Sequence, residues 1–143
     1  MATISASNST FMLSILALFP IPQQIQGYST DEAFASEAVE MAEVMKGVDG
    51  KMSFGFTPFI TPMTVALQAD SASNAIFDAW IAAMKAAKEV LPANGIISLP
   101  AIKSNYILTN GVLRMGPPFP ATRKVLQPRT FTIAWDDISV IAV

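Results

Sequence analysis

Apolar and polar residues alternate in several short segments of this chain, and turns that contain Pro or Gly separate those segments. The alternation is most regular in Met63–Ala69, in Arg129–Trp135 and in Lys51–Phe56. Successive side chains of a β-strand point to opposite faces of a sheet, so this pattern predicts strands with one buried face. The sequence therefore predicts a protein built mostly of antiparallel β-strands.

Other apolar stretches lack a helical period and add to the same prediction. Pro100 interrupts one of them, and Asn110-Gly111 breaks or bulges another. We expect these further strands in Phe11–Phe19, Ile21–Tyr28, Ile96–Ile102, Asn105–Met115 and Ile138–Val143.

One segment, Ala75–Val90, has helical periodicity. Its apolar residues recur at i, i+1, i+4, i+5 and i+8, which is the spacing of one face of an α-helix. Trp80 lies on this face, so we expect it in the core. The fold class is therefore mainly β, of the α+β type, with one amphipathic helix packed on the sheet. The residues of the apolar face are Ile76, Phe77, Trp80, Ile81 and Met84.

The segment Asp31–Lys46 is ambiguous. Ser29 and Glu32 fit a capping box, and the alternation expected of a strand is poor, so periodicity favours a helix. Gly47–Gly50 follows as a clear turn. Three acidic residues spaced by three would share one helical face: Glu37, Glu40 and Glu43.

The residue types present exclude many kinds of chemistry. The chain has no His and no Cys, which removes His-based triads, thiol nucleophiles and disulfides. It also lacks Gly-x-Ser-x-Gly elbows, phosphate-binding loops and calcium loops. Asp136-Asp137 is a pair of adjacent aspartates, and a solvated turn at a strand end explains it better than a cation site. We therefore expect no enzyme activity, no metal and no cofactor.

The apolar character of the chain does not indicate a membrane protein. Met1–Thr30 contains no charge, but its apolar run of nine residues is less than half of a membrane-spanning helix. A signal peptide needs a basic segment before the apolar one, and Met1–Thr10 has no Lys or Arg. We therefore expect no membrane insertion.

The low charge content points instead to contacts between copies. Twenty of the 143 residues are charged, whereas an average soluble domain of this length carries roughly 36. Much of the surface is therefore expected to be buried against other protein chains. The one basic cluster, Arg123, Lys124 and Arg129, is too small for a nucleic-acid site and equally suits a rim that pairs with acids of a neighbouring copy.

One specific segment is the strand that leads into Ser71-Ala72-Ser73-Asn74 and then the helix with Trp80. Together with several other segments, taken in order, it resembles structural proteins of contractile-tailed bacteriophages that have the tail-tube fold. The resemblance covers roughly Gln24–Trp135. The segments that carry it are Ile25–Tyr28, Gly47–Met52, Met63–Asn74 and Leu126–Ile133.

This resemblance implies a single tail-tube-like domain over residues 1–143, with two packed antiparallel sheets in a sandwich-like barrel. Such proteins form hexameric rings that stack into a hollow tube inside the sheath, above the baseplate. The implied location is the virion tail, assembled in the cytoplasm of the bacterial host, and DNA is only cargo that passes through the lumen.

The resemblance also implies roles for particular residues. It implies that Asp31–Lys46 is a strand of the lumen-lining sheet, whereas periodicity favours a helix for this segment. The loop Gly47, Val48, Asp49, Gly50 and Lys51 then reaches toward the next ring. If Glu37, Glu40 and Glu43 face the lumen, their charge repels DNA from the channel wall.

Three alternatives stay open at this point. The chain could be the main tube subunit, or a tube-like ring in the baseplate, at the tube start or at the tail end. It could also be a monomeric β-barrel that binds a small ligand, which predicts a soluble monomer at micromolar concentration. Size-exclusion chromatography separates this last class from the other two.

Overall fold

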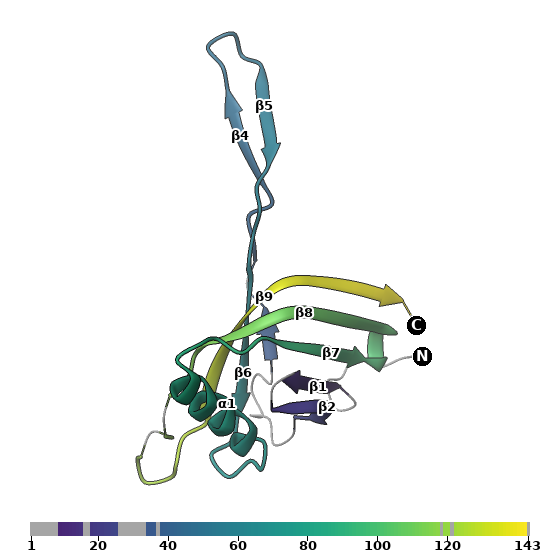
Figure 1. Cartoon of the computed structure of the whole chain (residues 1–143). Helices are drawn as coiled ribbons and strands as arrows, with labels where there is room; N and C mark the ends of the chain where they lie inside the picture. Colours follow the sequence, from purple (N-terminus) through teal and green to yellow (C-terminus); the bar gives the residue numbers. More distant parts are fainter. Residues whose placement is uncertain are drawn as a thin grey trace.

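The computed structural model describes residues 9–15, 18–25, 34–36, 38–117, 119–120 and 122–142, and they form a mainly β structure with one α-helix (Figure 1). The mainly β prediction is therefore confirmed. The elements are β1 (Thr10–Ile15), β2 (Phe19–Gln24), β3 (Phe34–Ser36), β4 (Ala42–Lys46), β5 (Met52–Phe56), β6 (Thr61–Leu67), α1 (Asn74–Ala87), β7 (Ala93–Leu99), the 3₁₀ helix η2 (Pro100–Ile102), β8 (Ser104–Met115) and β9 (Arg129–Ala142).

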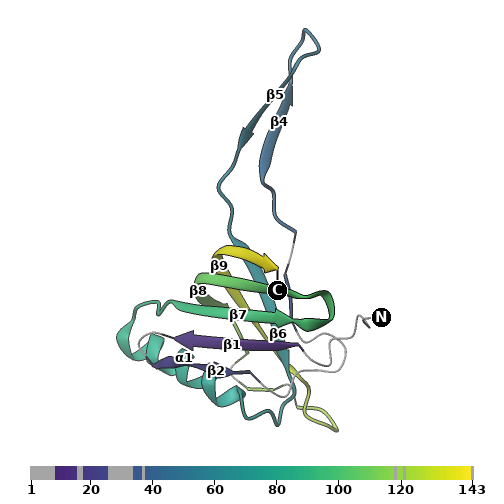
Figure 2. The ribbon, with the colours of Figure 1, turned by 90° about the vertical axis from the view of Figure 1, so that its right-hand side faces the viewer.

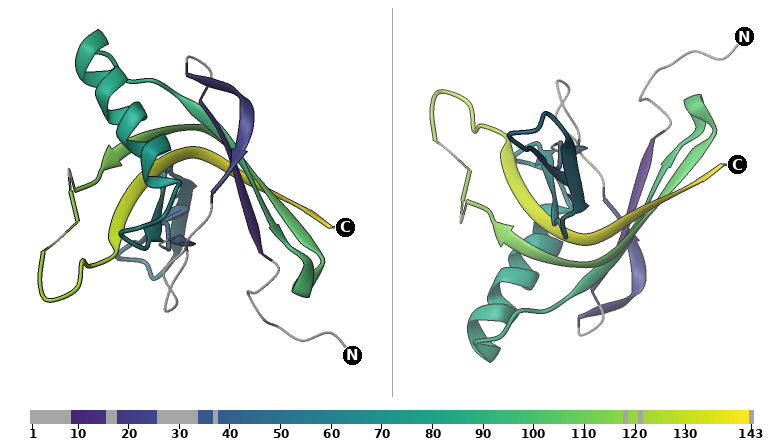
Figure 3. Two further views of the ribbon diagram at one scale, coloured as in Figure 1. Left: turned by 90° about the horizontal axis from the view of Figure 1, so that it is seen from below. Right: turned by 90° about the horizontal axis from the view of Figure 1, so that it is seen from above.

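The main sheet has seven strands in the order β2-β1-β7-β8-β9-β6-β3, and every pairing in it is antiparallel. The long strands β8 and β9 curve through the molecule (Figure 3). Residues 104–111 of β8 pair with β7, so this part of the β8-β9 pair extends the layer formed by β2, β1 and β7. Residues 129–135 of β9 pair with β6, so the other part extends the layer formed by β6 and β3. The predicted two packed sheets are thus two layers of one bent sheet.

The bend lies at Asn110–Gly111 in β8, opposite Trp135 in β9. Leu108 and Gly111 are both buried although they are three positions apart, an odd spacing, so the inward-facing positions shift by one residue at the bend. Asn110 has a positive φ of 52°. A Cβ atom at position 111 would lie 2.3 Å from Cε3 of Trp135. Glycine therefore leaves the space that the Trp135 ring fills across the bend.

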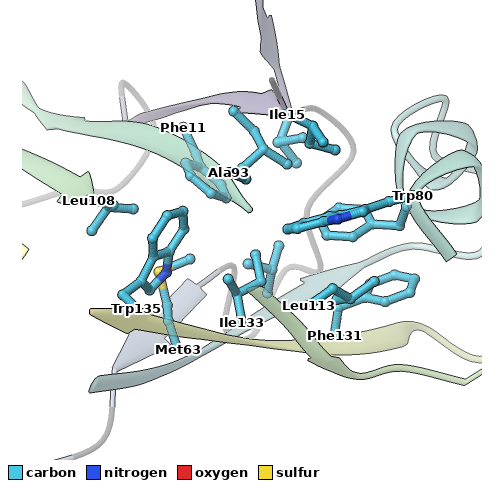
Figure 4. Close-up of a cluster of buried hydrophobic side chains, with 14 of the residues drawn as sticks. Phe11, Ile15, Met63, Trp80, Ala93, Leu108, Leu113, Phe131, Ile133 and Trp135 are labelled. Atoms are coloured by element: carbon cyan, nitrogen blue, oxygen red, sulfur yellow. The ribbon is translucent and has the colours of Figure 1, made fainter. Parts of the chain in front are cut away.

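The core lies between the two layers (Figure 4). Phe11 and Ala93 face it from one layer, and Ile133 and Trp135 face it from the other. Burial of one such large apolar side chain contributes about 1.5–3 kcal/mol to folding. The regular burial alternation of β6 confirms the one-sided strand predicted for Met63–Ala69. The same prediction for Lys51–Phe56 is wrong, because β5 is exposed on both faces.

Helix α1 packs on the edge of this core through its predicted apolar face. Phe77 and Phe131 stack with ring centroids 4.3 Å apart, and Trp80 Nε1 donates a hydrogen bond to the Leu91 carbonyl over 3.0 Å. At its start, the Asn74 side chain donates to the carbonyl oxygen of Gln68 over 2.9 Å. The Ser-x-Ser-Asn segment thereby joins the end of β6 directly to the helix.

The helix ends three residues earlier than the predicted Val90. Lys88 adopts a left-handed conformation with φ of 56°, and its N–H donates to the Met84 carbonyl over 2.8 Å. This αL cap stops the helix. The expected C-terminal limit was wrong because the cap residue is a Lys, which carries no strong stop signal in a sequence.

Strands β4 and β5 form a two-stranded arm that projects from the body (Figures 1 and 2). The described part of Asp31–Lys46 therefore contains the strands β3 and β4, and the helix that periodicity favoured is wrong there. Only β3 pairs with the main sheet, through β6. The expectation that the whole segment belongs to one sheet is thus corrected for β4.

Three smaller expectations also need correction. Phe11–Phe19 is not one strand, because a turn at Leu18 separates β1 from β2. Asn105–Met115 is not a pair of strands, because β8 continues through the bulge. Asp136-Asp137 lies inside β9 and not in a turn at a strand end.

Candidate assembly surfaces

The arm has one apolar face and one more polar face. Directly paired residues of two antiparallel strands lie on the same face, so the register defines the two sets. Ser53 and Gly55 belong to the polar set, together with Glu43 and Met45. The apolar set pairs Val44 with Phe54, Ala42 with Phe56 and Lys46 with Met52.

The described part of the chain leaves the apolar face of the arm largely uncovered, apart from an edge contact between the rings of Phe56 and Phe59. Phe54 is 74% exposed and Phe56 is 75% exposed, and all residues from 40 to 56 are exposed. Large uncovered apolar surfaces mark contact sites for other molecules. The arm is therefore the strongest candidate contact surface of the molecule.

The tip of the arm is the predicted inter-ring loop Gly47–Lys51. The Gly47 N–H donates to the Lys51 carbonyl over 2.8 Å, and the Lys51 N–H donates to Asp49 Oδ1 over 3.1 Å. Gly50 has a φ of 82°, which other residues rarely adopt. The loop is thus an ordered turn at the end of the molecule farthest from the body (Figure 2), and its contact with another ring stays a prediction.

The base of the arm contains a hollow of about 600 Å³. Two hydrogen bonds join the chain segments there: Thr57 donates through its N–H to the Met41 carbonyl and through Oγ1 to the Glu40 carbonyl. The lining combines two carboxylates with apolar side chains. Its residues are Ala38, Val39, Glu40, Glu43, Thr57, Pro58, Phe59, Ile60 and Pro62.

Two of the three predicted lumen acids thus meet at this hollow. Glu40 precedes β4 and Glu43 lies within it, and both are exposed. Glu37 lies outside the described residues. A position of these acids on a channel wall is not tested by a single copy of the chain and stays a prediction.

The predicted basic rim is only partly at the surface. Arg123 and Lys124 are exposed in the connection between β8 and β9, next to the exposed apolar residues Val125 and Leu126. A bridge between Thr122 and Leu126 closes this short turn.

Arg129 does not belong to this rim, because it is 4% exposed and its charge is paired within the chain. Its guanidinium binds Asp78 of α1 over 2.8 Å, and Nη2 also donates to the Pro117 carbonyl over 2.9 Å. This clamp between Arg129 and Asp78 was missed at the sequence level, since 51 residues separate its members.

A free backbone edge is a further surface. The pairing of β9 with β6 ends at Trp135, whereas its pairing with β8 continues to Ala142. Among the described strands, none pairs with the other side of Asp136–Ala142. Such an edge presents unpaired N–H and C=O groups that another strand can bind.

The described residues offer little for ligand chemistry. No group of three acidic side chains among them lies close enough together to hold a metal ion. Nor does this part of the chain contain a helix with the length and apolar character needed to span a bilayer.

Solved structures share this fold over nearly the whole chain. A chain of the anti-feeding prophage cap, described as a tube terminating cap, matches with a TM-score of 0.67 at 13% identity, covering 100% of this chain and 93% of that chain. A chain of the anti-feeding prophage baseplate matches with 0.64 at 12% identity, covering 100% and 99%. A chain of the PVC sheath-tube complex, an extracellular contractile injection system, matches with 0.61 at 18% identity, covering 93% and 88%.

The chain thus shares its fold, a bent antiparallel sheet with an α-helix packed on it, with these chains of the anti-feeding prophage and of the PVC sheath-tube complex. The chain belongs to the Tail fiber protein gp32 family, whose family model matches residues 2–139. The predicted resemblance to phage tail structural proteins is therefore confirmed. A search of curated proteins finds no match for this chain.

Proposed function

We propose that copies of this chain, each acting as one domain over residues 1–143, close into a ring that forms part of a hollow tail tube. The observation that carries the proposal is the arm, whose apolar face is uncovered in a single copy. A face of this kind in water costs free energy, and association with another chain removes that cost. We infer a homohexamer from the resemblance to tail-tube proteins.

Ring closure also gives the free edge of β9 a partner. The segment Asp136–Ala142 offers seven residues for pairing and contains no Pro. By contrast, β2 at the other edge carries Pro20 and Pro22, which remove two backbone donors. We therefore propose that the β9 edge takes part in the contact between neighbours of a ring.

A ring at a tube end or in a baseplate is the second form of the same proposal. The tube terminating cap and the baseplate of the anti-feeding prophage each contain a chain of this fold, which favours this form. Its partners would be tail sheath and baseplate proteins, in a virion tail assembled in the bacterial cytoplasm, with DNA as passing cargo and no enzymatic role. A main tube subunit grows into long tubes on its own, whereas a terminal ring stops at one ring.

Electron microscopy of the purified chain tests the proposal. We expect annular or tubular particles, and size-exclusion chromatography with light scattering should give a mass of several copies. A chain that stays monomeric at every concentration would contradict the proposal and favour the small-ligand β-barrel. Tubes of indefinite length would indicate a main tube subunit, whereas single rings would indicate a ring at a tube end or in a baseplate.

A further inference from the structure

The charges of this chain are divided between two regions of the sequence. Between positions 31 and 49 there are six acidic residues and one Lys. Between positions 90 and 135 there are five basic residues and no acidic one. A chain that contacts its own copies can use such a separation to fix the direction of the contact.

The structure places exposed members of the two regions at opposite ends of the body, one at the base of the arm and one on the side away from it. Glu40 and Glu43 line the hollow at the base of the arm. The connection between β8 and β9 lies at the end of the body that faces away from the arm (Figures 1 and 2). We call the exposed residues Phe119, Arg123, Lys124, Val125 and Leu126 of this connection the basic loop.

The basic loop and the hollow match in chemistry as well as in charge. Three large apolar side chains of the basic loop are exposed: Phe119 at 68%, Val125 at 73% and Leu126 at 51%. The hollow offers apolar side chains on its walls, including Phe59 and Ile60. Each surface thus combines two charged side chains with apolar groups, and the charges of the two surfaces have opposite signs.

Interactions within the chain hold both ends of the connection that carries the basic loop, and they also hold the base of the arm. The clamp between Arg129 and Asp78 also binds the Pro117 carbonyl, and it thereby fixes the start and the end of the connection that carries the basic loop. Thr57 fixes the base of the arm through its two hydrogen bonds. Preorganised surfaces bind more tightly because less conformational freedom is lost.

We propose that the basic loop of one copy docks into the hollow at the arm base of the next copy along the arm direction. This inference rests on the proposed function and adds the pair of surfaces that joins one ring to the next. Arg123 and Lys124 then pair with Glu40 and Glu43 of the other copy. The contact is head-to-tail, so it repeats along an axis, and many weak contacts act together between two rings.

Charge reversal tests the pairing. Glu40→Lys/Glu43→Lys or Arg123→Glu/Lys124→Glu should raise the protein concentration needed for stacking about tenfold or more, since attraction becomes repulsion. A mixture of the two variants should restore stacking, because each hollow then finds a loop of opposite charge. The matched control Asp70→Lys/Glu89→Lys reverses two exposed acids elsewhere and should stack like the natural chain.

Cross-linking tests the contact directly, since the chain has no Cys of its own. Mixed Ile60→Cys and Val125→Cys chains should form a disulfide-linked heterodimer within assembled particles. Ile60→Cys mixed with Asp70→Cys should not. Both positions of the test pair are exposed in the single chain, so neither substitution disturbs the core.

The outcomes separate this inference from the proposed function. Particles that assemble normally after either charge reversal, and show no Ile60–Val125 cross-link, would overturn the surface pair and leave the ring proposal standing. A natural chain that stays monomeric would overturn both.

Discussion

The guanidinium of Arg129 donates hydrogen bonds to both carboxylate oxygens of Asp78, over 2.8 and 3.3 Å, and ties β9 to α1. The Arg129 side chain is 4% exposed, whereas that of Asp78 is 53% exposed. The same guanidinium lies 4.9 Å from the centre of the Phe131 ring, and it binds the Pro117 carbonyl. One cation thus holds a strand, a helix and a loop together.

This asymmetry in exposure predicts unequal effects of removing either partner. Asp78→Ala leaves a buried cation with a single carbonyl acceptor, which should lower the free energy of unfolding by about 2 kcal/mol. Arg129→Met fills the site with an apolar chain and leaves Asp78 in water, so we expect a loss of about 1 kcal/mol. Urea unfolding followed by Trp fluorescence, at one fixed protein concentration, measures both. A larger loss for Arg129→Met would contradict this view of the clamp.

The contact of Gly111 with Trp135 gives a second prediction. Gly111→Ala places a methyl group where the indole ring lies, and should cost about 2–3 kcal/mol of unfolding free energy. Gly55→Ala is the matched control, because nothing lies within 4 Å of a Cβ atom there. It should change stability by less than about 0.5 kcal/mol. Equal effects of the two variants in urea unfolding would show that the bend does not depend on this glycine.

The two faces of the arm should differ in assembly and not in stability. Met52→Thr/Phe54→Thr removes apolar side chains from the uncovered face, whereas Ser53→Thr/Gly55→Thr changes the opposite face. All four positions are exposed, so each variant should unfold within about 0.5 kcal/mol of the natural chain in urea.

Particle counts in negative-stain images then measure the contact. We expect the first arm variant to lose rings and tubes and the second to keep them, because only the first reduces the apolar area available for burial. Normal assembly of both variants would remove the arm face from the contact and with it the main support for the ring proposal.

Much of the fold follows from local patterns, and the departures have physical causes. The alternation in Met63–Ala69 and the helical face around Trp80 predicted β6 and α1 correctly, because both bury one face on the core. Asp31–Lys46 could not be assigned, since β4 is exposed on both faces and burial imposes no pattern on it. β4 is a strand because it pairs with β5, and this pairing cannot be predicted from the propensities of its own residues.

The sequence predicts less of the candidate surfaces than of the fold. Arg123 and Lys124 are exposed, and their role in a rim between copies stays a prediction. Arg129 was grouped with them by its position in the sequence, which does not indicate burial, and it lies in the interior. Its partner Asp78 comes from a different element, brought near only by the packing of α1 on the sheet. The hollow likewise combines residues from both sides of the arm, so its charge and its apolar lining become visible together only in three dimensions.

A neutral substitution at the hollow separates the two roles proposed for its acids. Glu40→Gln/Glu43→Gln keeps the shape of both side chains and removes their charge. If they pair with the basic loop, stacking of the natural chain weakens as salt rises, because ions screen the pairs. The variant should stack more weakly at low salt and respond less to added salt, as light scattering against salt concentration would record.

A channel-wall role gives a different result in the same variant. The particles would then assemble like those of the natural chain at every salt concentration, and only the passage of DNA would slow, because the wall no longer repels it. We expect the change in assembly, since both carboxylates border a hollow with apolar walls that a second protein surface can fill. Unchanged stacking together with slower DNA delivery from infecting particles would assign Glu40 and Glu43 to the channel instead.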